Sequence, residues 1–419
     1  MGEGTYVTKS NISKAKHSSR ATRSINLPFD VPLLLIIIVL LVFGLLMVYS
    51  ASWDFSMLMG EGPTYMFGRQ VLWVLLGLVL AVIASFIDYH HYKKILVPMW
   101  FGTLLLLLAI LINNQRGGME ATRMLLGGSI QPSELAKPVI IIYLSFWLYN
   151  RQETINDFQF ALIPMAVILG LTFSFIMVQP DLSAALTVIF LGVLLFFLAG
   201  GDWKIILLMV IIAVVVGLPL IFLYPTGRAR MDYYLTGLNN PLESSYHIQR
   251  SLEAVIKGGW FGVGIGQADT KFTGLPLAPT DSIFAVVAEE TGVMGGLFLV
   301  VMFSLLVWRG IVIARKAPDQ LGSLLAFGIT SWIGFEAMMN MGTMIGLIPF
   351  TGNALPFISA GGSSMVVTLT SLGIVMNVSR TSMKNKAQNV QNSERSPRSA
   401  VVDLRRRDGR GSVPRHHRS

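Results

Sequence analysis

The feature that most constrains this chain is its succession of long apolar runs. A helix needs about 20 predominantly apolar residues to cross the hydrocarbon core of a membrane. The 419-residue sequence offers about ten such runs, at 31–51, 69–87, 94–113, 132–149, 158–178, 181–199, 203–224, 283–308, 321–348 and 360–379. The sequence therefore predicts an all-α polytopic membrane protein, a bundle of about ten transmembrane helices.

Charge is concentrated at the two ends of the chain. Residues 1–30 contain five Lys and Arg against two acids, and residues 380–419 contain eleven against three, so the tails exceed the whole formal net charge of +9. Only 13% of the chain is charged, against about 25% in a soluble domain. This distribution argues for a membrane protein with cationic tails and against a nucleic-acid partner. The absence of cysteine excludes disulfides and a Cys nucleophile.

The tails and loops also predict a topology. Ser, Asn, Arg and Lys dominate both ends, so we expect disordered basic tails at 1–30 and 381–419 around a transmembrane domain at 31–380. An even number of spans puts both termini on one side. Counting Lys and Arg with both termini in the cytoplasm gives 23 inside and 8 outside, which is the bias that cytoplasmic segments carry.

The segment 225–282, between the seventh and eighth spans, is too long for an ordinary connection. Loops beyond about 15 residues are uncommon unless they are functional or disordered, and this one keeps many apolar and aromatic residues. Apolar residues at 248, 252, 255 and 256 have the spacing of an amphipathic helix within 244–256. We expect helices that lie over the bundle on its extracytoplasmic face.

Several ionisable or amide side chains fall at membrane depth, where they are costly and often functional. Glu134 and Lys137 are three residues apart on one helix face and can pair. Each group alone can be explained as a helix-packing hydrogen bond or an internal salt bridge. Together they predict a polar cavity that opens to the outer face; its expected structural residues are Glu134, Lys137, Asp181, Glu289, Glu290, Glu336 and Asn340.

A set of motifs in register resembles the SEDS family, the shape, elongation, division and sporulation proteins of the FtsW, RodA and SpoVE group. The motifs are Tyr49-Ser50-Ala51-Ser52, Gln131-Pro132-Ser133-Glu134-Leu135-Ala136-Lys137, Gln179-Pro180-Asp181-Leu182, Gly258-Gly259 with Gly262 and Gly264, Thr280-Asp281-Ser282-Ile283-Phe284-Ala285, Glu289-Glu290-Thr291-Gly292, Leu355-Pro356-Phe357-Ile358-Ser359 and Gly361-Gly362-Ser363-Ser364. The resemblance runs from about residue 40 to 380. The wording of the motifs and the long N-terminal tail favour the FtsW branch over the RodA branch.

The resemblance implies a peptidoglycan glycosyltransferase that polymerises lipid II at the outer face of the bacterial cytoplasmic membrane, in division or elongation. The essential acid of the family falls on Asp281, which we expect to act as general base. Departure of undecaprenyl diphosphate needs cations, and the loop holds several. The expected substrate-binding residues are Arg123, Arg228, Arg230, Lys271, Ser363 and Ser364. A divalent cation, Mg²⁺ or Mn²⁺, held partly by Asp281 is an alternative role for that residue, and no other cofactor is implied.

Some residues depart from the family pattern. Leu277-Ala278-Pro279 replaces a stretch that usually contains Glu and often His, so Asp281 is the only acid in its motif. Met124, Ser183, Arg250 and Ala360 are further departures.

The resemblance also implies partners: a class B penicillin-binding protein that cross-links the glycan, other divisome or elongasome membrane proteins, and membrane lipids. Two other functions stay open at this point. A lipid II flippase would also use a polar cavity in a ten-helix bundle, although no inverted pair of broken helices is apparent. A non-catalytic scaffold for other wall enzymes would not need Asp281.

Overall fold

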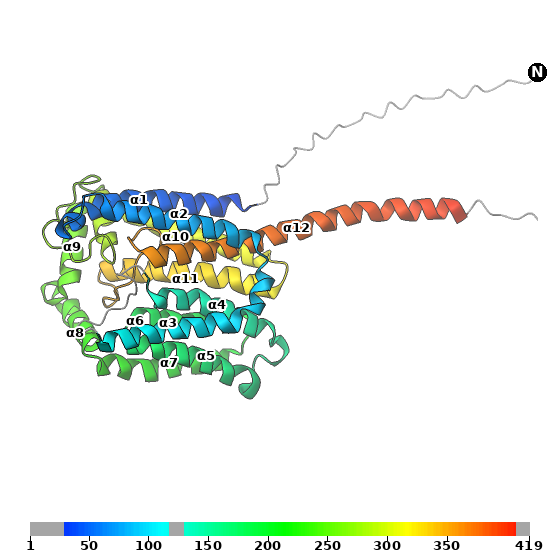
Figure 1. Cartoon of the computed structure of the whole chain (residues 1–419), viewed down its shortest axis with the longest axis horizontal. Coiled ribbons are helices and arrows are strands. Elements are labelled where there is room, and N and C mark those ends of the chain that lie inside the picture. Colours follow the sequence, from blue (N-terminus) through cyan, green and yellow to red (C-terminus); the bar gives the residue numbers. More distant parts are fainter. Residues whose placement is uncertain (1–28, 117–129, 408–419) are drawn as a thin grey trace, which may run out of the picture.

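Each of the expected spans forms a helix in the computed structural model, which describes residues 29–116 and 130–407 (Figure 1). In chain order these helices are α1 (Val31–Leu58), α2 (Tyr65–Phe86), α3 (Leu96–Arg116), α4 (Pro132–Tyr149), α5 (Ile163–Val178), α6 (Leu182–Leu198), α7 (Trp203–Leu223), α10 (Ile283–Arg315), α11 (Gln320–Met344) and α12 (Gly362–Arg407). They run side by side along one axis. The predicted all-α helical bundle is confirmed.

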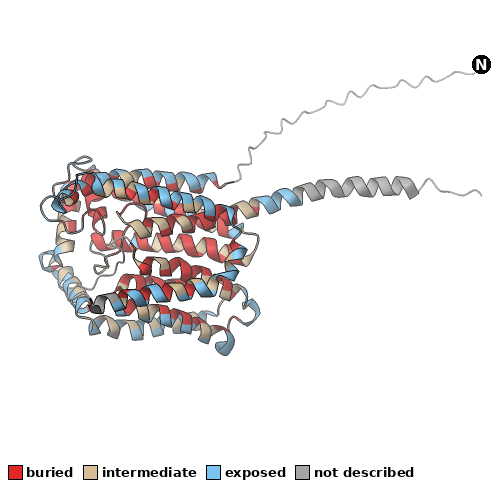
Figure 2. Ribbon diagram, viewed as in Figure 1, coloured by how far each residue is buried: buried red, intermediate tan, exposed pale blue. Residues whose placement is uncertain are grey.

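Seven of the described helices are long and apolar enough to cross a membrane, and α6 and most of α3 are shorter apolar helices. The tenth, α4, has 18 residues and carries Glu134 and Lys137 near its start. Although α4 is short and carries charges, 14 of its residues are buried inside the bundle, so most of the helix packs against other helices. The helix α7 is the opposite case, since none of its residues is buried. Figure 2 shows this gradient from a buried centre to exposed outer helices.

Two further helices lie across the end of the bundle opposite to the start of α1 and the extension of α12 (Figure 1). They are α8 (Pro225–Asn239) and α9 (Tyr246–Gly258), joined through the short turn Pro241–Glu243. The amphipathic helix expected within 244–256 is therefore present. Its buried face differs, however: Ser251, Ala254 and Gly258 face the bundle beside Ile248, whereas Ile256 is exposed. Small residues are needed there because a Cβ on Gly258 would clash with the carbonyl oxygen of Ala288 in α10.

The helix α10 is broken at Gly292, whose φ of 69° is open to glycine at little cost. The segment after α9 fills the break with backbone hydrogen bonds. The amide of Val263 donates to the carbonyl of Glu289 at 2.9 Å, and the amide of Val293 donates to the carbonyl of Gly259 at 2.9 Å. The loop is thereby held against α10 at the level of Glu289 and Glu290, where unpaired backbone groups would otherwise be costly.

The C-terminal tail differs from the sequence-based expectation. We expected disorder from residue 381, but α12 continues as a helix to Arg407. No glycine occurs between 381 and 407, so no strong C-cap signal stops the helix where its apolar pattern ends. The N-terminal tail lies outside the described residues, apart from its last two positions.

At the end of the bundle where α1 begins, a polar cluster joins the turn Tyr89–Lys94 to α11. The ring of His90 bridges Asp88 and Asp319, with 2.7 Å from Nδ1 and from Nε2 to the two carboxylates. Asp319 also caps α11, accepting from the amide of Gly322 at 2.7 Å. Burial acts against protonation of the ring, but the hydrogen bonds to Asp88 and Asp319 outweigh it and raise the pKa of His90.

This raised pKa predicts a pH-dependent stability. A group whose pKa is raised in the folded state stabilises the fold fully below its unfolded value, about 6.5 for His. That stabilisation is lost as the pH rises through the folded value. We expect the detergent-solubilised protein to lose less than about 1 kcal/mol between pH 6 and pH 9 through this cluster, because the side chain is half exposed. Thermal melts of the wild type and of His90→Gln measure it. An equal pH dependence in both proteins would contradict the assignment.

Candidate active site

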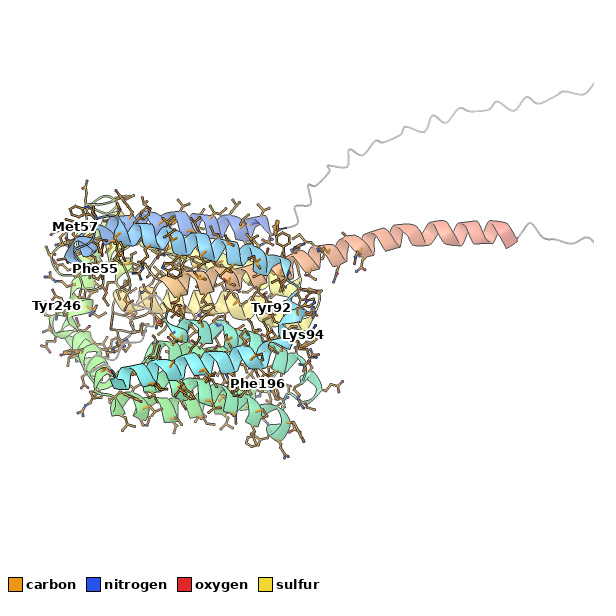
Figure 3. The ribbon with its side chains drawn as sticks, in the orientation of Figure 1. Phe55, Met57, Tyr92, Lys94, Phe196 and Tyr246 are labelled. Atoms are coloured by element: carbon orange, nitrogen blue, oxygen red, sulfur yellow. The ribbon has the colours of Figure 1, made fainter. Side chains whose placement is uncertain are left out.

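A cavity of about 400 Å³, lined by charged and polar side chains together with apolar ones, lies at the end of the bundle covered by α8 and α9. Its walls come from the end of α1, the start of α2, the first turns of α4 and α12, and the segments before α10 and after α11. Figure 3 shows Phe55, which lines this cavity, at the same end as Tyr246 of α9, and Tyr92 and Lys94 at the other end. Four residues expected in the site are brought together here: Glu134, Asp281, Ser363 and Ser364.

Asp281 lies just before α10, and its backbone is held from two directions. The side-chain Nδ2 of Asn340 in α11 donates to the backbone carbonyl of Asp281 at 2.8 Å and also to the backbone carbonyl of Asn353. On the other side, Ser359 donates to the carbonyl of Thr280 at 2.7 Å. These bonds tie the loop before α10 to the loop before α12. The Asp281 side chain is thus carried on a rigid backbone.

The start of α4 meets the start of α12 across the cavity. The amide of Gln131 donates to Ser363 Oγ at 3.1 Å. The Gln131 side chain donates to Asp181 Oδ2 at 3.1 Å, and Ser133 donates to the same oxygen at 2.9 Å. Asp181 also accepts from the backbone amide of Ala184 and so caps α6. It therefore joins α4 to α6 behind the cavity wall, a structural position.

Two arginines, Arg69 and Arg230, lie at the cavity or beside it. Arg69, one turn into α2, lines the cavity together with Asp281. Its side chain makes no ion pair or hydrogen bond within residues 29–116 and 130–407. Arg230 of α8 reaches the same region: a Cβ built on Gly352 would lie 3.5 Å from Asp281 Oδ2 and 4.0 Å from Arg230 Nη2. The carboxylate and the guanidinium therefore border one small space above Gly352.

Aromatic packing positions Arg230. Its Nη1 donates to the carbonyl of Thr351 at 3.3 Å, and its guanidinium lies 5.4 Å from the ring centroid of Phe350. The ring of His247 in α9 also stacks on Phe350, at 4.4 Å. Burial and the nearby Arg230 lower the pKa of His247, so that the ring is neutral at physiological pH and does not add a second cation beside Arg230.

Two expected substrate-binding cations, Arg228 and Lys271, do not line the cavity. Arg228 is on α8, but its side chain is 70% exposed and its nearest carboxylate is Asp232 at 3.8 Å; two residues along a helix, it faces away from Arg230. Lys271 is buried, and its Nζ donates to Glu290 Oε1 at 2.7 Å and to the Ser50 carbonyl at 3.1 Å. Burial of Glu290 requires this partner, so Lys271 serves the fold. Arg123 lies outside the described residues.

Below the cavity, Lys137 forms a buried ion triad. Its Nζ is 2.6 Å from Glu134 Oε1 and also pairs with Glu336 of α11. The pair expected between Glu134 and Lys137 is thus present. Glu336, expected as a structural residue of the cavity, pairs with Lys137, because an uncompensated carboxylate would be costly between buried helices.

Glu289 stabilises the loop after α9. It accepts from the backbone amides of Asp269 at 2.9 Å and Thr270 at 3.3 Å, and from the Thr270 hydroxyl. With Glu290 held by Lys271, both acids of α10 are used to fix the loop that ends at Asp281. Neither lines the cavity.

The carboxylates on the cavity wall are Asp281 and Glu134, and the latter is already paired with Lys137. In the part of the chain that is described, no three His, Asp or Glu side chains are grouped to hold a metal ion. Mg²⁺ commonly binds through one or two carboxylates and substrate phosphates. A Mg²⁺ or Mn²⁺ ion at Asp281 would therefore need a phosphate-bearing substrate to supply further ligands.

The Asp281 carboxylate and the two arginines together could support transfer of a group from an anionic leaving group to a hydroxyl. A carboxylate on a fixed backbone can remove a proton from a hydroxyl group, and guanidinium groups beside it can bind an anionic leaving group through several N–H donors. Arg69 is the residue that reasoning from sequence missed. The available signal was that it is the one cation at the outer end of the second span.

Comparison with known proteins gives consistent matches over most of the chain. Residues 31–384 match the model of the FtsW, RodA and SpoVE family, described as cell cycle protein. A probable peptidoglycan glycosyltransferase FtsW of Geobacter metallireducens is 38% identical over 354 residues, covering 84% of this chain and 94% of the relative. Stage V sporulation protein E of Bacillus subtilis is 36% identical, covering 84% and 97%.

Among solved structures, one similar chain comes from a peptidoglycan synthase complex described as coordinating polymerization and crosslinking. It is 27% identical, covers 84% of this chain and 98% of its own length, and has a TM-score of 0.69.

Proposed function

Because the chain belongs to the FtsW, RodA and SpoVE family of cell cycle proteins, we propose that it is a peptidoglycan glycosyltransferase that polymerises lipid II into glycan strands. The observation that carries this proposal is the placement of Asp281 on a cavity wall with Arg69, and beside Arg230 across Gly352. A base and two cations are what transfer of a glycosyl group from a diphosphate requires.

The reaction follows from these positions. The Asp281 carboxylate takes the proton from the 4-hydroxyl of the acceptor GlcNAc as that oxygen attacks the anomeric carbon of the donor MurNAc. The bond from that carbon to the diphosphate oxygen breaks, and undecaprenyl diphosphate leaves with the electron pair. Arg69 and Arg230 stabilise its negative charge. Ser363 and Ser364 offer hydroxyls to the sugars. In the alternative role of Asp281, a divalent cation held partly by its carboxylate would neutralise charge on the diphosphate.

The expected topology suits this reaction. The protein is a multi-pass membrane protein, and we place it in the bacterial cytoplasmic membrane with both termini in the cytoplasm and the cavity at the outer face, where lipid II is consumed. The basic tails then face anionic lipids. We assign it a class B penicillin-binding protein as partner, together with other divisome or elongasome proteins, since a similar solved chain comes from a peptidoglycan synthase complex described as coordinating polymerization and crosslinking.

Two other functions compete with polymerisation. A lipid II flippase needs access to its cavity from both faces, whereas this cavity lies at one end of the bundle, with the Glu134–Lys137–Glu336 triad beneath it. A scaffold would not need an acid and cations gathered around one space. The observed geometry favours the polymerase over both.

The deciding experiment uses the full chain purified with its cognate class B penicillin-binding protein and labelled lipid II. We expect glycan strands on a gel when the transpeptidase is blocked by a β-lactam. The same preparation in liposomes tests transport of lipid II between leaflets. Transport without glycan would favour the flippase, and neither activity would favour the scaffold.

Substitution of Arg69, with Arg228 as a control, gives a sharper test of the site. Arg69→Gln removes a charged donor from the cavity and is expected to raise KM for lipid II by about ten- to a hundredfold, the cost of losing a hydrogen bond to a charged group. Arg228→Gln is the matched control, since it removes the same charge from an exposed position on α8 and should leave KM nearly unchanged. Equal effects from the two substitutions would reject the assignment of Arg69.

A further inference from the structure

The loop that follows α9 presents an exposed apolar surface. Residues 260–265, here called the apolar segment, contain only glycine and apolar residues. In it Trp260 is 68% exposed and Phe261 is 81% exposed, and Val263 and Ile265 are also exposed. A protein surface in water rarely gathers this many large apolar side chains in one place. The apolar segment therefore needs something other than water to cover it.

Two contacts between α1 and α10 mark depth in the membrane. At the end where α1 begins, Asp30 pairs with Arg309 of α10 at 2.8 Å. Toward the end covered by α9, Ser50 of α1 donates to Glu290 of α10. Ser50 comes twenty residues after Asp30, and Arg309 comes nineteen residues after Glu290. At 1.5 Å per residue both stretches span about 30 Å, the thickness of the hydrocarbon core. Ser50 and Glu290 therefore lie near the boundary of that core on the α9 side.

The apolar segment lies at this boundary, because its backbone is bonded to α10 on both sides of the helix break. The amide of Gly264 donates to the carbonyl of Glu290 at 3.1 Å. The amide of Met294 donates to the carbonyl of Trp260 at 3.2 Å. Irregular backbone at membrane depth is tolerated only where its polar groups find partners within the protein. The break in α10 supplies such partners, so the apolar segment can lie beside lipid without the usual cost.

We propose that the apolar segment inserts into the lipid leaflet on the α9 side of the bundle, where headgroups meet acyl chains, and anchors the long loop to the bilayer. Tryptophan and other amphipathic aromatic side chains favour this level, since the ring is apolar and the indole N–H can reach polar groups. The flanking charges agree with this position. Lys257 and Asp269 pair with each other at 3.1 Å, so neither leaves an unpaired charge beside the apolar segment.

The lipid-facing surface of α10 continues into the apolar segment. Val293, Leu297 and Val300 are exposed at the spacing of one helix face, and α10 is one of the helices long and apolar enough to span the membrane. This face begins at the level where the apolar segment is bonded to α10, so lipid that covers the one also reaches the other. The same long loop ends at Asp281. The anchor therefore fixes the height of that loop relative to the bilayer.

The chain contains no cysteine, so a single introduced cysteine can carry a nitroxide spin label at a chosen position. Phe261→Cys places the label on the apolar segment, and Ile265→Cys provides a second position there. Leu242→Cys is the matched control, because its side chain is also 81% exposed but lies in the short turn between α8 and α9. Each labelled full chain is reconstituted in vesicles of phosphatidylethanolamine and phosphatidylglycerol.

Power saturation then compares collisions of each label with oxygen, which concentrates among the acyl chains, and with a water-soluble nickel chelate present on both sides of the membrane. We expect the labels at 261 and 265 to collide more with oxygen than with nickel, and the label at 242 to show the reverse. Labels at 261 and 265 as open to nickel as the label at 242 would place the apolar segment in water. Labels shielded from both reagents would show that protein covers it. Either result would overturn the proposal, and neither depends on glycan synthesis.

Discussion

Replacing Asp281 by asparagine is expected to lower kcat/KM for lipid II polymerisation by about 10²- to 10⁴-fold, the range that a positioned general base contributes. The substitution keeps the shape of the side chain. It also leaves the backbone bond from Asn340 to the Asp281 carbonyl and the bond from Ser359 to the Thr280 carbonyl in place. The loss should therefore fall on the chemical step. Gel analysis of glycan chains from purified lipid II gives the rates.

Asp269→Asn is the matched control for this prediction. Asp269 belongs to the same long loop, its side chain is 64% exposed, and it pairs with Lys257 at 3.1 Å on the surface. Removing its charge should change the polymerisation rate little, because a surface ion pair contributes little. An Asp281→Asn enzyme that polymerises at the wild-type rate would rule out the base assignment. In cells, normal growth of the Asp281→Ala strain would support the scaffold.

Replacing Lys137 by methionine is expected to destabilise the fold by about 3–5 kcal/mol, the cost of breaking a buried ion pair from one side. Lys137 is among the largest fully buried side chains, and its ammonium lies between Glu134 and Glu336. Without it, two carboxylates face each other between α4 and α11 with no cation. We expect a lower melting temperature in detergent and a smaller yield of monodisperse protein.

The triple variant Glu134→Gln, Lys137→Met, Glu336→Gln separates charge balance from catalysis. Replacing a whole buried ionic cluster by neutral groups is often neutral or stabilising, so this variant should recover the melting temperature. If it also recovers polymerisation, the triad holds the cavity in shape. A triple variant that folds and stays inactive would instead give the triad a direct role toward substrate.

Whether a feature could be predicted from the sequence depends on how far apart its interacting residues are in the chain. The spans and the helix within 244–256 were predictable, because apolar periodicity is a local property of about 20 residues. The pair of Glu134 and Lys137 was also predictable, since residues three apart on a helix are neighbours. The third member, Glu336, comes from another helix, and no local pattern distinguishes it from Asn340.

The positions of the basic residues also depend on contacts that are distant in sequence. Lys271 and Arg230 are equivalent in the sequence, as basic residues of one loop. The break of α10 at Gly292 and the bonds across it bring Lys271 under the loop to neutralise Glu290, while Phe350 and Thr351 hold Arg230 at Gly352. Arg69 reaches the cavity through the packing of α2 beside α12. These placements depend on contacts between segments that lie far apart in the chain.

By itself, the sequence determined that this protein is a helical membrane bundle with basic ends, which family it resembles, and that Asp281 is the acid to test. Those conclusions rest on hydrophobic periodicity, charge distribution and motifs, all of which can be read along one chain. The tertiary structure decided which arginines lie beside Asp281 and which charged side chains stabilise the fold. The physical reason is that a buried charge takes its partner from whichever helix packs against it, and that packing arises only when distant segments meet.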